Sequence, residues 1–173
     1  MRIFLVGLPG AGKSTVGRHL ASELDATFYD LDEEIELRAG ADIPWIFDVE
    51  GEAGFRNRES AVVKDFAALN DVVIATGGGV VLREENRSVM SQSSTVVYLS
   101  ASLSTLVSRT SGKSKRPLLA GKDVKQVLKE LMRVREPLYQ QIADVTVAST
   151  GGSAKKLAGV IAERIALLER TSK

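Results

Sequence analysis

Short apolar runs recur along this chain, each bounded by polar residues or glycine. They span residues 3–6, 27–29, 72–75, 96–99 and 145–148. Segments with helical spacing of apolar residues separate them, and this alternation predicts a parallel β-sheet covered by helices on both faces. We therefore expect an α/β fold, built as a single domain over residues 1–173.

The clearest helical pattern lies near the end of the chain, in residues 153–170. Its apolar positions recur three and four residues apart, as in a helix with one buried stripe: Leu157, Val160, Ile161, Ile165 and Leu168. Ser153 stands where an N-cap residue belongs. We expect this stripe to cover the sheet and to carry no chemistry.

The first apolar run continues into a glycine-rich segment and then a helix. The segment reads Gly7-Leu8-Pro9-Gly10-Ala11-Gly12-Lys13-Ser14-Thr15. It matches the pattern of Gly, four residues and Gly-Lys-Ser/Thr, whose backbone N–H groups and helix N-terminus bind nucleotide phosphates. In this pattern Lys13 reaches the β- and γ-phosphates, and the Ser14 hydroxyl ligates Mg²⁺. The chain is therefore predicted to bind a nucleoside triphosphate.

Composition excludes several classes of protein. With 44% apolar and 26% charged residues, the chain has the ordinary composition of a soluble globular protein. Its net charge is +1, so it lacks the strong positive electrostatic field that would indicate binding to nucleic acid. The absence of cysteine excludes disulfides, thiolate metal sites and cysteine nucleophiles, so metal chemistry must use oxygen ligands. No segment approaches the ~18 apolar residues of a membrane span. We expect a cytoplasmic protein without nucleic-acid or membrane partners.

Two acids, Asp30 and Asp32, follow the second apolar run. Ligands of open parallel sheets bind outside the carboxyl ends of the strands, so both acids are expected near the phosphate loop. We assign Asp30 to Mg²⁺, directly or through water, and Asp32 to the hydroxyl of an acceptor. The third run ends without an acid, which strengthens the case for Asp30. The alternative is a helix N-cap with first-turn acids.

The third run instead ends in Gly77-Gly78-Gly79. Glycines allow close approach of the backbone to a substrate, which their N–H groups can then bind. A flexible strand-to-helix turn is the alternative interpretation.

Residues 32–69 are too many for a plain crossover between parallel strands, so we predict a helical lobe that holds the acceptor. Arg56 and Arg58 differ by about 200° around a helix, so at most one of them can face a pocket. Glu59 could orient Arg56, or the two could form a solvated ion pair.

Residues 111–122 combine glycine, serine and cations between two helical patterns. We predict a mobile lid that carries Arg116 to phosphate, with a solvated basic loop as the alternative. Downstream, Arg135 and Tyr139 lie on either side of Pro137, which is expected to end or start a helix.

Together these segments resemble the shikimate kinase family over nearly the whole chain. The resemblance rests on an ordered set of motifs: Gly7 to Ser14; Asp30-Leu31-Asp32; Ile43, Phe47, Gly51, Glu52, Phe55, Arg56 and Glu59; Gly77-Gly78-Gly79; Arg116-Pro117-Leu118-Leu119; and Arg135-Glu136-Pro137-Leu138-Tyr139. One departure is the small, featureless segment 149–152, which leaves the adenine contacts open.

The resemblance implies a P-loop kinase fold with a five-stranded parallel sheet in the order 2-3-1-4-5. It implies transfer of the ATP γ-phosphoryl group to the 3-hydroxyl of shikimate with Mg²⁺, in the pathway to the aromatic amino acids. We expect the protein to be a monomer. Arg56 and Arg135 would clamp the shikimate carboxylate with help from the Gly78 N–H.

By the same resemblance, three residues carry the chemistry. Lys13 would stabilise charge on the phosphates, Asp32 would hold the ring hydroxyls, and Arg116 would close over the phosphates. Arg109, with the loop after Val147, would border the adenine.

Two rival functions remain. A gluconate or nucleoside-monophosphate kinase would share the architecture but lack the Phe-Arg-x-x-Glu element that follows Gly-Glu. A GTP-dependent switch would need an Asn-Lys-x-Asp guanine reader, and this tetrapeptide does not occur.

Overall fold

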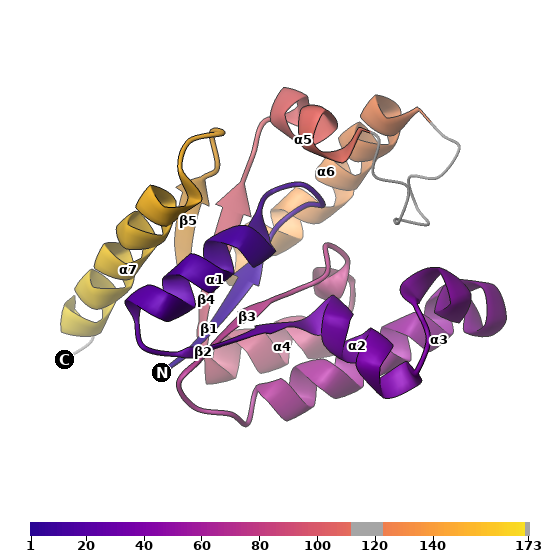
Figure 1. The fold of residues 1–173 in the computed structure, drawn as a ribbon, viewed down its shortest axis with the longest axis horizontal. Helices are drawn as coiled ribbons and strands as arrows, with labels where there is room; N and C mark the ends of the chain where they lie inside the picture. The colour runs from indigo at the N-terminus through magenta and orange to yellow at the C-terminus, as the bar shows by residue number, and fades with distance from the viewer. Residues whose placement is uncertain (112–122, 172–173) are drawn as a thin grey trace.

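Five parallel strands form one sheet in the order β2-β3-β1-β4-β5, with helices on both of its faces (Figure 1). The computed structural model describes residues 1–111 and 123–171. The strands are β1 (Arg2–Val6), β2 (Thr27–Asp30), β3 (Val72–Ala75), β4 (Thr95–Ser100) and β5 (Val145–Ala148). The helices are α1 (Lys13–Glu23), α2 (Leu31–Ala39), α3 (Ile43–Phe66), α4 (Glu84–Ser93), α5 (Leu103–Thr110), α6 (Val124–Ile142) and α7 (Ala154–Thr171), with a 3₁₀ turn, η1 (Val80–Leu82).

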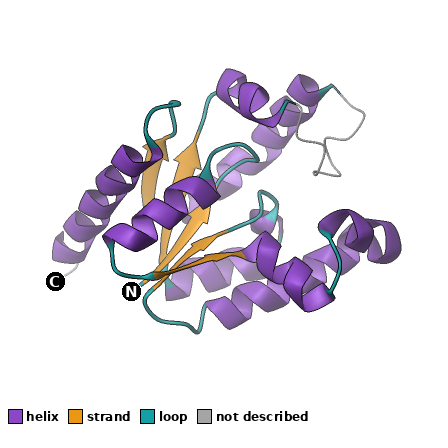
Figure 2. Ribbon diagram, viewed as in Figure 1, coloured by secondary structure: helices purple, strands orange, loops and turns teal. Residues whose placement is uncertain are grey.

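The predicted sheet is confirmed, and burial explains why its strands could be recognised. The central strands β1, β3 and β4 are buried along nearly their whole length, because helices cover both faces of the sheet. Such strands read as continuous apolar runs. The edge strand β5 instead alternates buried and exposed residues. Helices α1 and α7 pack together on one face, and α4 and α6 contact the sheet on the other (Figure 2).

The predicted apolar stripe of α7 is partly wrong. Ile161 and Ile165 are buried against the core, but Val160 and Leu168 remain 40% and 36% exposed. Because α7 packs against α1 near the edge of the sheet, only a narrow stripe of the helix is covered.

The expectation for Pro137 is also wrong, because Pro137 lies inside α6. Proline removes one hydrogen bond of a helix. The side chains of Arg135 and Tyr139, on either side of it, are buried, and the Tyr139 hydroxyl donates to the Gly78 carbonyl in the turn after β3.

Residues 32–69, the predicted acceptor lobe, form most of α2, all of α3 and the turn that follows. Asp42 caps α3 by accepting a hydrogen bond from the Trp45 N–H at 2.9 Å. Gly51, with φ 71° and ψ 178°, breaks α3 into two helical parts. The predicted lid lies outside the described residues except for Ser111, and Arg116 lies outside them as well. In the described part of the chain, every helix is too short or too polar to cross a bilayer.

Candidate functional site

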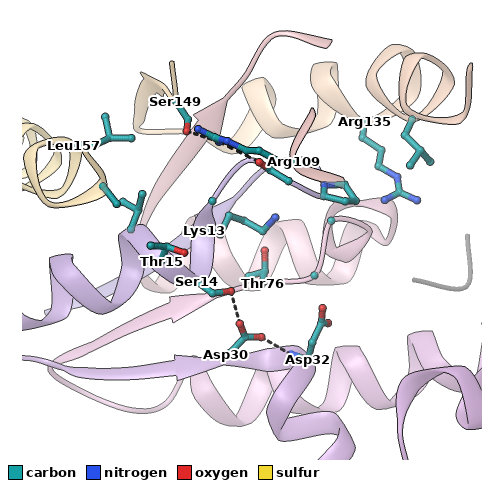
Figure 3. Close-up of a pocket in the computed structure, with 18 of the residues that line it drawn as sticks. Lys13, Ser14, Thr15, Asp30, Asp32, Thr76, Arg109, Arg135, Ser149 and Leu157 are labelled. Carbon is teal, nitrogen blue, oxygen red and sulfur yellow. Dashed lines mark hydrogen bonds between the residues drawn. The ribbon is translucent and has the colours of Figure 1, made fainter. Parts of the chain in front are cut away.

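A cavity of about 1120 Å³ is lined by residues that directly follow β1, β2, β3 and β5. The carboxyl ends of parallel strands are where open α/β sheets bind ligands. Figure 3 shows Leu157 of α7 and Arg135 of α6 at opposite ends of this cavity, with Lys13, Ser14 and Asp30 between them. One cavity is therefore lined by groups from all of these elements.

The phosphate loop follows β1 and ends at the N-terminus of α1. Gly10 and Gly12 have φ values of 88° and 92°, which side chains other than glycine rarely adopt. The Lys13 ammonium lies across the loop and donates hydrogen bonds to the carbonyls of Gly7 at 2.8 Å and Leu8 at 3.1 Å. The amine is thus held at the loop that is predicted to bind phosphate.

Arg109 of α5 ties this loop to the segment after β5. Its Nη1 donates to the carbonyls of Gly10 at 3.1 Å and Ala11 at 3.3 Å, and to the Ser149 hydroxyl at 3.0 Å (Figure 3). A single guanidinium therefore fixes the distance between the phosphate loop and the 149–152 segment.

Ser14, at the end of the phosphate loop, forms a hydrogen bond with Asp30, at the end of β2. The Ser14 hydroxyl donates to Asp30 Oδ2 at 2.5 Å, and Asp30 Oδ1 accepts from the Asp32 N–H at 3.0 Å (Figure 3). Asp30 is therefore both the N-cap of α2 and the partner of Ser14, so the two interpretations of this acid are compatible.

This pair fits the ligand chemistry of Mg²⁺. The described residues contain no group of three or more His, Cys, Asp or Glu side chains that could enclose a metal. Mg²⁺ usually takes one or two protein oxygens and completes its shell with water and substrate phosphate. A hydroxyl and a carboxylate beside a phosphate loop supply such a partial set.

Space, and not backbone conformation, requires glycine at residues 77–79. None of the three has a positive φ in the left-handed region. A Cβ atom on Gly77 would lie 2.8 Å from Asp32 Oδ1 and 3.1 Å from Glu59 Oε1. The turn after β3 therefore packs directly against two carboxylates that line the cavity.

The next two glycines contact other parts of the site. A Cβ on Gly78 would lie 2.8 Å from Pro9 Cδ of the phosphate loop, and a Cβ on Gly79 would overlap the Arg56 guanidinium. This close packing contradicts the alternative of a merely flexible turn.

Arg56 faces the cavity and Arg58 does not line it, as the helical spacing predicted. Arg56 Nη1 donates to Glu59 Oε2 at 2.7 Å, and the side chains are only 9% and 1% exposed, so this is not a solvated pair. Burial raises the pKa of Glu59, and the nearby Arg56 opposes that shift. Arg58 instead pairs with Glu50 at 2.7 Å.

Arg135 of α6 is the second buried arginine at the cavity. Burial lowers its pKa, Tyr139 raises it, and Arg56 lowers it further. Arg135 forms no ion pair with a carboxylate of residues 1–111 or 123–171. Two buried guanidinium groups line one cavity, and one buried carboxylate, Glu59, pairs with Arg56, so the excess of buried positive charge favours an anionic ligand.

Most predicted site residues lie at the cavity, and some do not. The predicted residues that line it are Pro9, Gly10, Gly12, Lys13, Ser14, Thr15, Asp30, Asp32, Arg56, Gly77, Gly78, Gly79, Arg109 and Arg135. Gly7, Leu8 and Ala11 belong to the buried part of the loop, behind the cavity surface.

Four residues of α7 that the sequence does not mark as site residues line the cavity: Ala154, Lys156, Leu157 and Val160. Leu157 and Val160 were expected to cover the sheet. An amphipathic pattern marks burial but cannot separate burial under a sheet from burial against a ligand. No other signal in the sequence indicates their position.

Comparison with known proteins gives a consistent result. The profile of the family described as shikimate kinase matches residues 9–166. The chain is 49% identical over 162 residues to a shikimate kinase of Chromobacterium violaceum, covering 94% of this chain and 88% of that protein. It is 50% identical over 163 residues to a shikimate kinase of Shewanella oneidensis, covering 94% and 95%.

Solved structures extend the likeness to three dimensions. Shikimate kinase from Acinetobacter baumannii, solved in complex with shikimate, superposes with a TM-score of 0.94 at 42% identity, covering 99% of this chain and 95% of that one. A gluconokinase from Sinorhizobium meliloti reaches a TM-score of 0.62 at 18% identity, with coverage of 99% and 95%, and shares only the fold.

Proposed function

The chain belongs to the shikimate kinase family, and on this premise we propose that it transfers the γ-phosphoryl group of ATP to the 3-hydroxyl of shikimate. The products are shikimate 3-phosphate and ADP, in the biosynthesis of chorismate and the aromatic amino acids. The observation that carries the proposal is one cavity that joins a phosphate loop to two buried arginines.

At the nucleotide end, the chain's own residues supply charge and position. Phosphoryl transfer passes through a loose transition state in most analyses, so electrostatic stabilisation and alignment dominate. Lys13 would exchange its bonds to the Gly7 and Leu8 carbonyls for bonds to the phosphates. Arg109 would border the adenine, and Arg116 would close over the phosphates.

Ser14 and Asp30 would hold Mg²⁺, which supplies positive charge to the phosphates when it is bound. Their mutual hydrogen bond supports this assignment, because it places two oxygen ligands together at the loop. Asp30 also caps α2, so this carboxylate is held in place by backbone as well as by Ser14.

At the acceptor end, Asp32 would hold and aim the attacking hydroxyl. Because the transition state is loose, the orientation of the attacking hydroxyl matters more than the strength of Asp32 as a base. Arg56, Arg135 and the Gly78 N–H would bind the carboxylate. Arginine suits this task because its planar fork donates two parallel hydrogen bonds to a carboxylate.

We propose further that the enzyme works as a monomer in the cytoplasm, without nucleic-acid or membrane partners. The cavity supports the first point, because one chain supplies both its phosphate end and its arginine end.

A coupled assay of ADP release tests the activity. Shikimate, gluconate and a nucleoside monophosphate are offered as separate acceptors with ATP and Mg²⁺, and Lys13→Ala serves as the inactive control. We expect shikimate to give by far the highest kcat/KM. Better turnover with gluconate or with the monophosphate would show that the proposal is wrong.

A further inference from the structure

Tyr139 connects two parts of the acceptor site that are far apart in the sequence. Its side chain is completely buried in α6, one turn after Arg135. Its hydroxyl donates a short hydrogen bond to the Gly78 carbonyl, in the turn after β3. The phenol therefore bridges the helix that carries Arg135 and the triglycine turn.

The hydrogen bond can run in only one direction. A carbonyl can only accept, so the Tyr139 O–H must donate to Gly78 and its oxygen must use its lone pairs elsewhere. Arg135 has only donors, and it lies within hydrogen-bonding reach of this phenol. The Tyr139 hydroxyl is therefore placed to complete a chain in which the Arg135 guanidinium donates to it and it donates to the Gly78 carbonyl.

This chain also orients a peptide group. Peptide units next to glycine rotate easily, because no Cβ restricts them. The peptide bonds of the described residues are trans, so the Gly79 N–H points away from the carbonyl that Tyr139 holds. Neither the Gly78 N–H nor the Gly79 N–H donates to another described residue.

We propose that Tyr139 is a positioning residue of the acceptor site, which holds Arg135 and the 78–79 backbone in one fixed relation so that both meet the same carboxylate. This inference rests on the proposed function, because it assumes that an acid acceptor binds there. Tyr139 acts through its neighbours and need not touch the substrate.

The chain offers a matched control. The ring of Tyr98 on β4 stacks on that of Tyr139, with centroids 5.2 Å apart and planes 24° apart. Tyr98 is also buried, but its hydroxyl bonds to Glu136 Oε1 at 3.2 Å and not to the triglycine turn. Tyr139→Phe and Tyr98→Phe thus each remove one hydroxyl from the same aromatic pair while the rings remain.

The experiment measures the Kd of shikimate by calorimetry, the KM of each substrate, and thermal unfolding. A lost hydrogen bond that also loosens the site should raise the Kd and KM of shikimate about 5- to 10-fold in Tyr139→Phe. The KM of ATP should stay within about twofold, because the phosphate loop is untouched. Tyr98→Phe should bind both substrates as the wild type does, with a comparable shift of Tm.

A second acceptor separates positioning from general destabilisation. An analogue with CH₂OH in place of the carboxylate should bind wild type and Tyr139→Phe equally, because it cannot use the oriented groups. Two results would overturn the inference while the proposed function stands, provided that the wild type phosphorylates shikimate. In the first, Tyr139→Phe binds shikimate as tightly as the wild type does. In the second, Tyr139→Phe and Tyr98→Phe lose affinity for shikimate and for ATP to the same extent. A wild type that does not phosphorylate shikimate overturns both.

Discussion

The Glu59 carboxylate holds the Arg56 guanidinium at 2.7 Å, and both side chains are buried at the edge of the cavity. Arg56 also lies against the Cα of Gly79, where a Cβ atom would overlap it. The guanidinium is thus fixed from two sides before any ligand binds. Such preorganisation reduces the cost of binding an anion.

Arg56→Ala should weaken shikimate far more than its CH₂OH analogue. Breaking one partner of a buried charge pair costs about 2 to 5 kcal/mol, or roughly 30- to several-thousand-fold in affinity, whereas an exposed pair is worth under about 1 kcal/mol. A double-mutant cycle of enzyme against acceptor, measured as kcat/KM, gives the coupling.

Arg58→Ala is the matched control, because Arg58 lies on the same helix but pairs with Glu50 outside the cavity. It should affect both acceptors little. Equal losses for shikimate and the alcohol in Arg56→Ala would show that Arg56 supports the lobe and not the carboxylate. Arg135→Ala repeats the test for the second arginine.

The buried Glu59 should make stability depend on pH in a direction opposite to that of most acids. Burial raises the pKa of Glu59 above 4.5, so the folded state holds a proton that the unfolded state releases. The stability that the folded state gains by holding this proton is complete below pH 4.5. It is lost as the pH rises through the raised pKa of Glu59 in the folded state. The free energy of unfolding of wild type minus that of Glu59→Gln should therefore fall as pH rises above 4.5.

Urea unfolding at a series of pH values measures this difference. Glu52→Gln is the control, because Glu52 also reaches Arg56, at 3.4 Å, but is 54% exposed. Its difference from wild type should vary less with pH. A wild-type advantage over Glu59→Gln that grows with pH would contradict the prediction.

Asp30→Asn should raise the Mg²⁺ concentration needed for half-maximal activity by about 10- to 100-fold. Asparagine still caps a helix well, so α2 should remain intact while the charge next to Ser14 is lost. Asp42→Asn makes the same change at the cap of α3, outside the cavity, and should leave the Mg²⁺ requirement unchanged.

Asp32→Asn should instead lower kcat at saturating Mg²⁺, because the acceptor hydroxyl is no longer oriented toward the phosphate. Steady-state rates over a Mg²⁺ titration distinguish the variants. Interchanged phenotypes of Asp30→Asn and Asp32→Asn would mean that the two roles must be exchanged.

Gly79→Ala should raise the KM of shikimate by about 10- to 100-fold, because the added methyl group must displace Arg56 and small displacements of a binding group are costly. Gly159→Ala is the control. Nothing lies within 4 Å of a Cβ at Gly159 in α7, so this change should stabilise the helix by up to about 1 kcal/mol and leave the KM unchanged. An unaltered KM in Gly79→Ala would refute the role of space at this glycine.

The sequence by itself determined the strands, the phosphate loop and the family. Strands covered on both faces must be apolar throughout, so the runs 3–6, 72–75 and 96–99 fall within the central strands β1, β3 and β4. The runs 27–29 and 145–148 fall within the edge strands β2 and β5. The phosphate loop could be recognised because a short contiguous segment performs its task with its own backbone. The same local logic showed that Arg56 and Arg58 point in different directions, because helical geometry depends only on spacing.

Only the tertiary structure decided which side chains meet across the cavity. Leu157 and Val160 look like core residues in the sequence, since an apolar pattern does not say what covers it. Pro137 looks like a helix end, but it lies inside α6, between the buried side chains of Arg135 and Tyr139. The bond from Tyr139 to Gly78 joins residues 61 positions apart, and such a contact depends on how α6 packs beside the turn after β3. Local propensity acts over a few neighbouring residues, whereas the acceptor site is made of groups that only the packing of the whole sheet and its helices brings together.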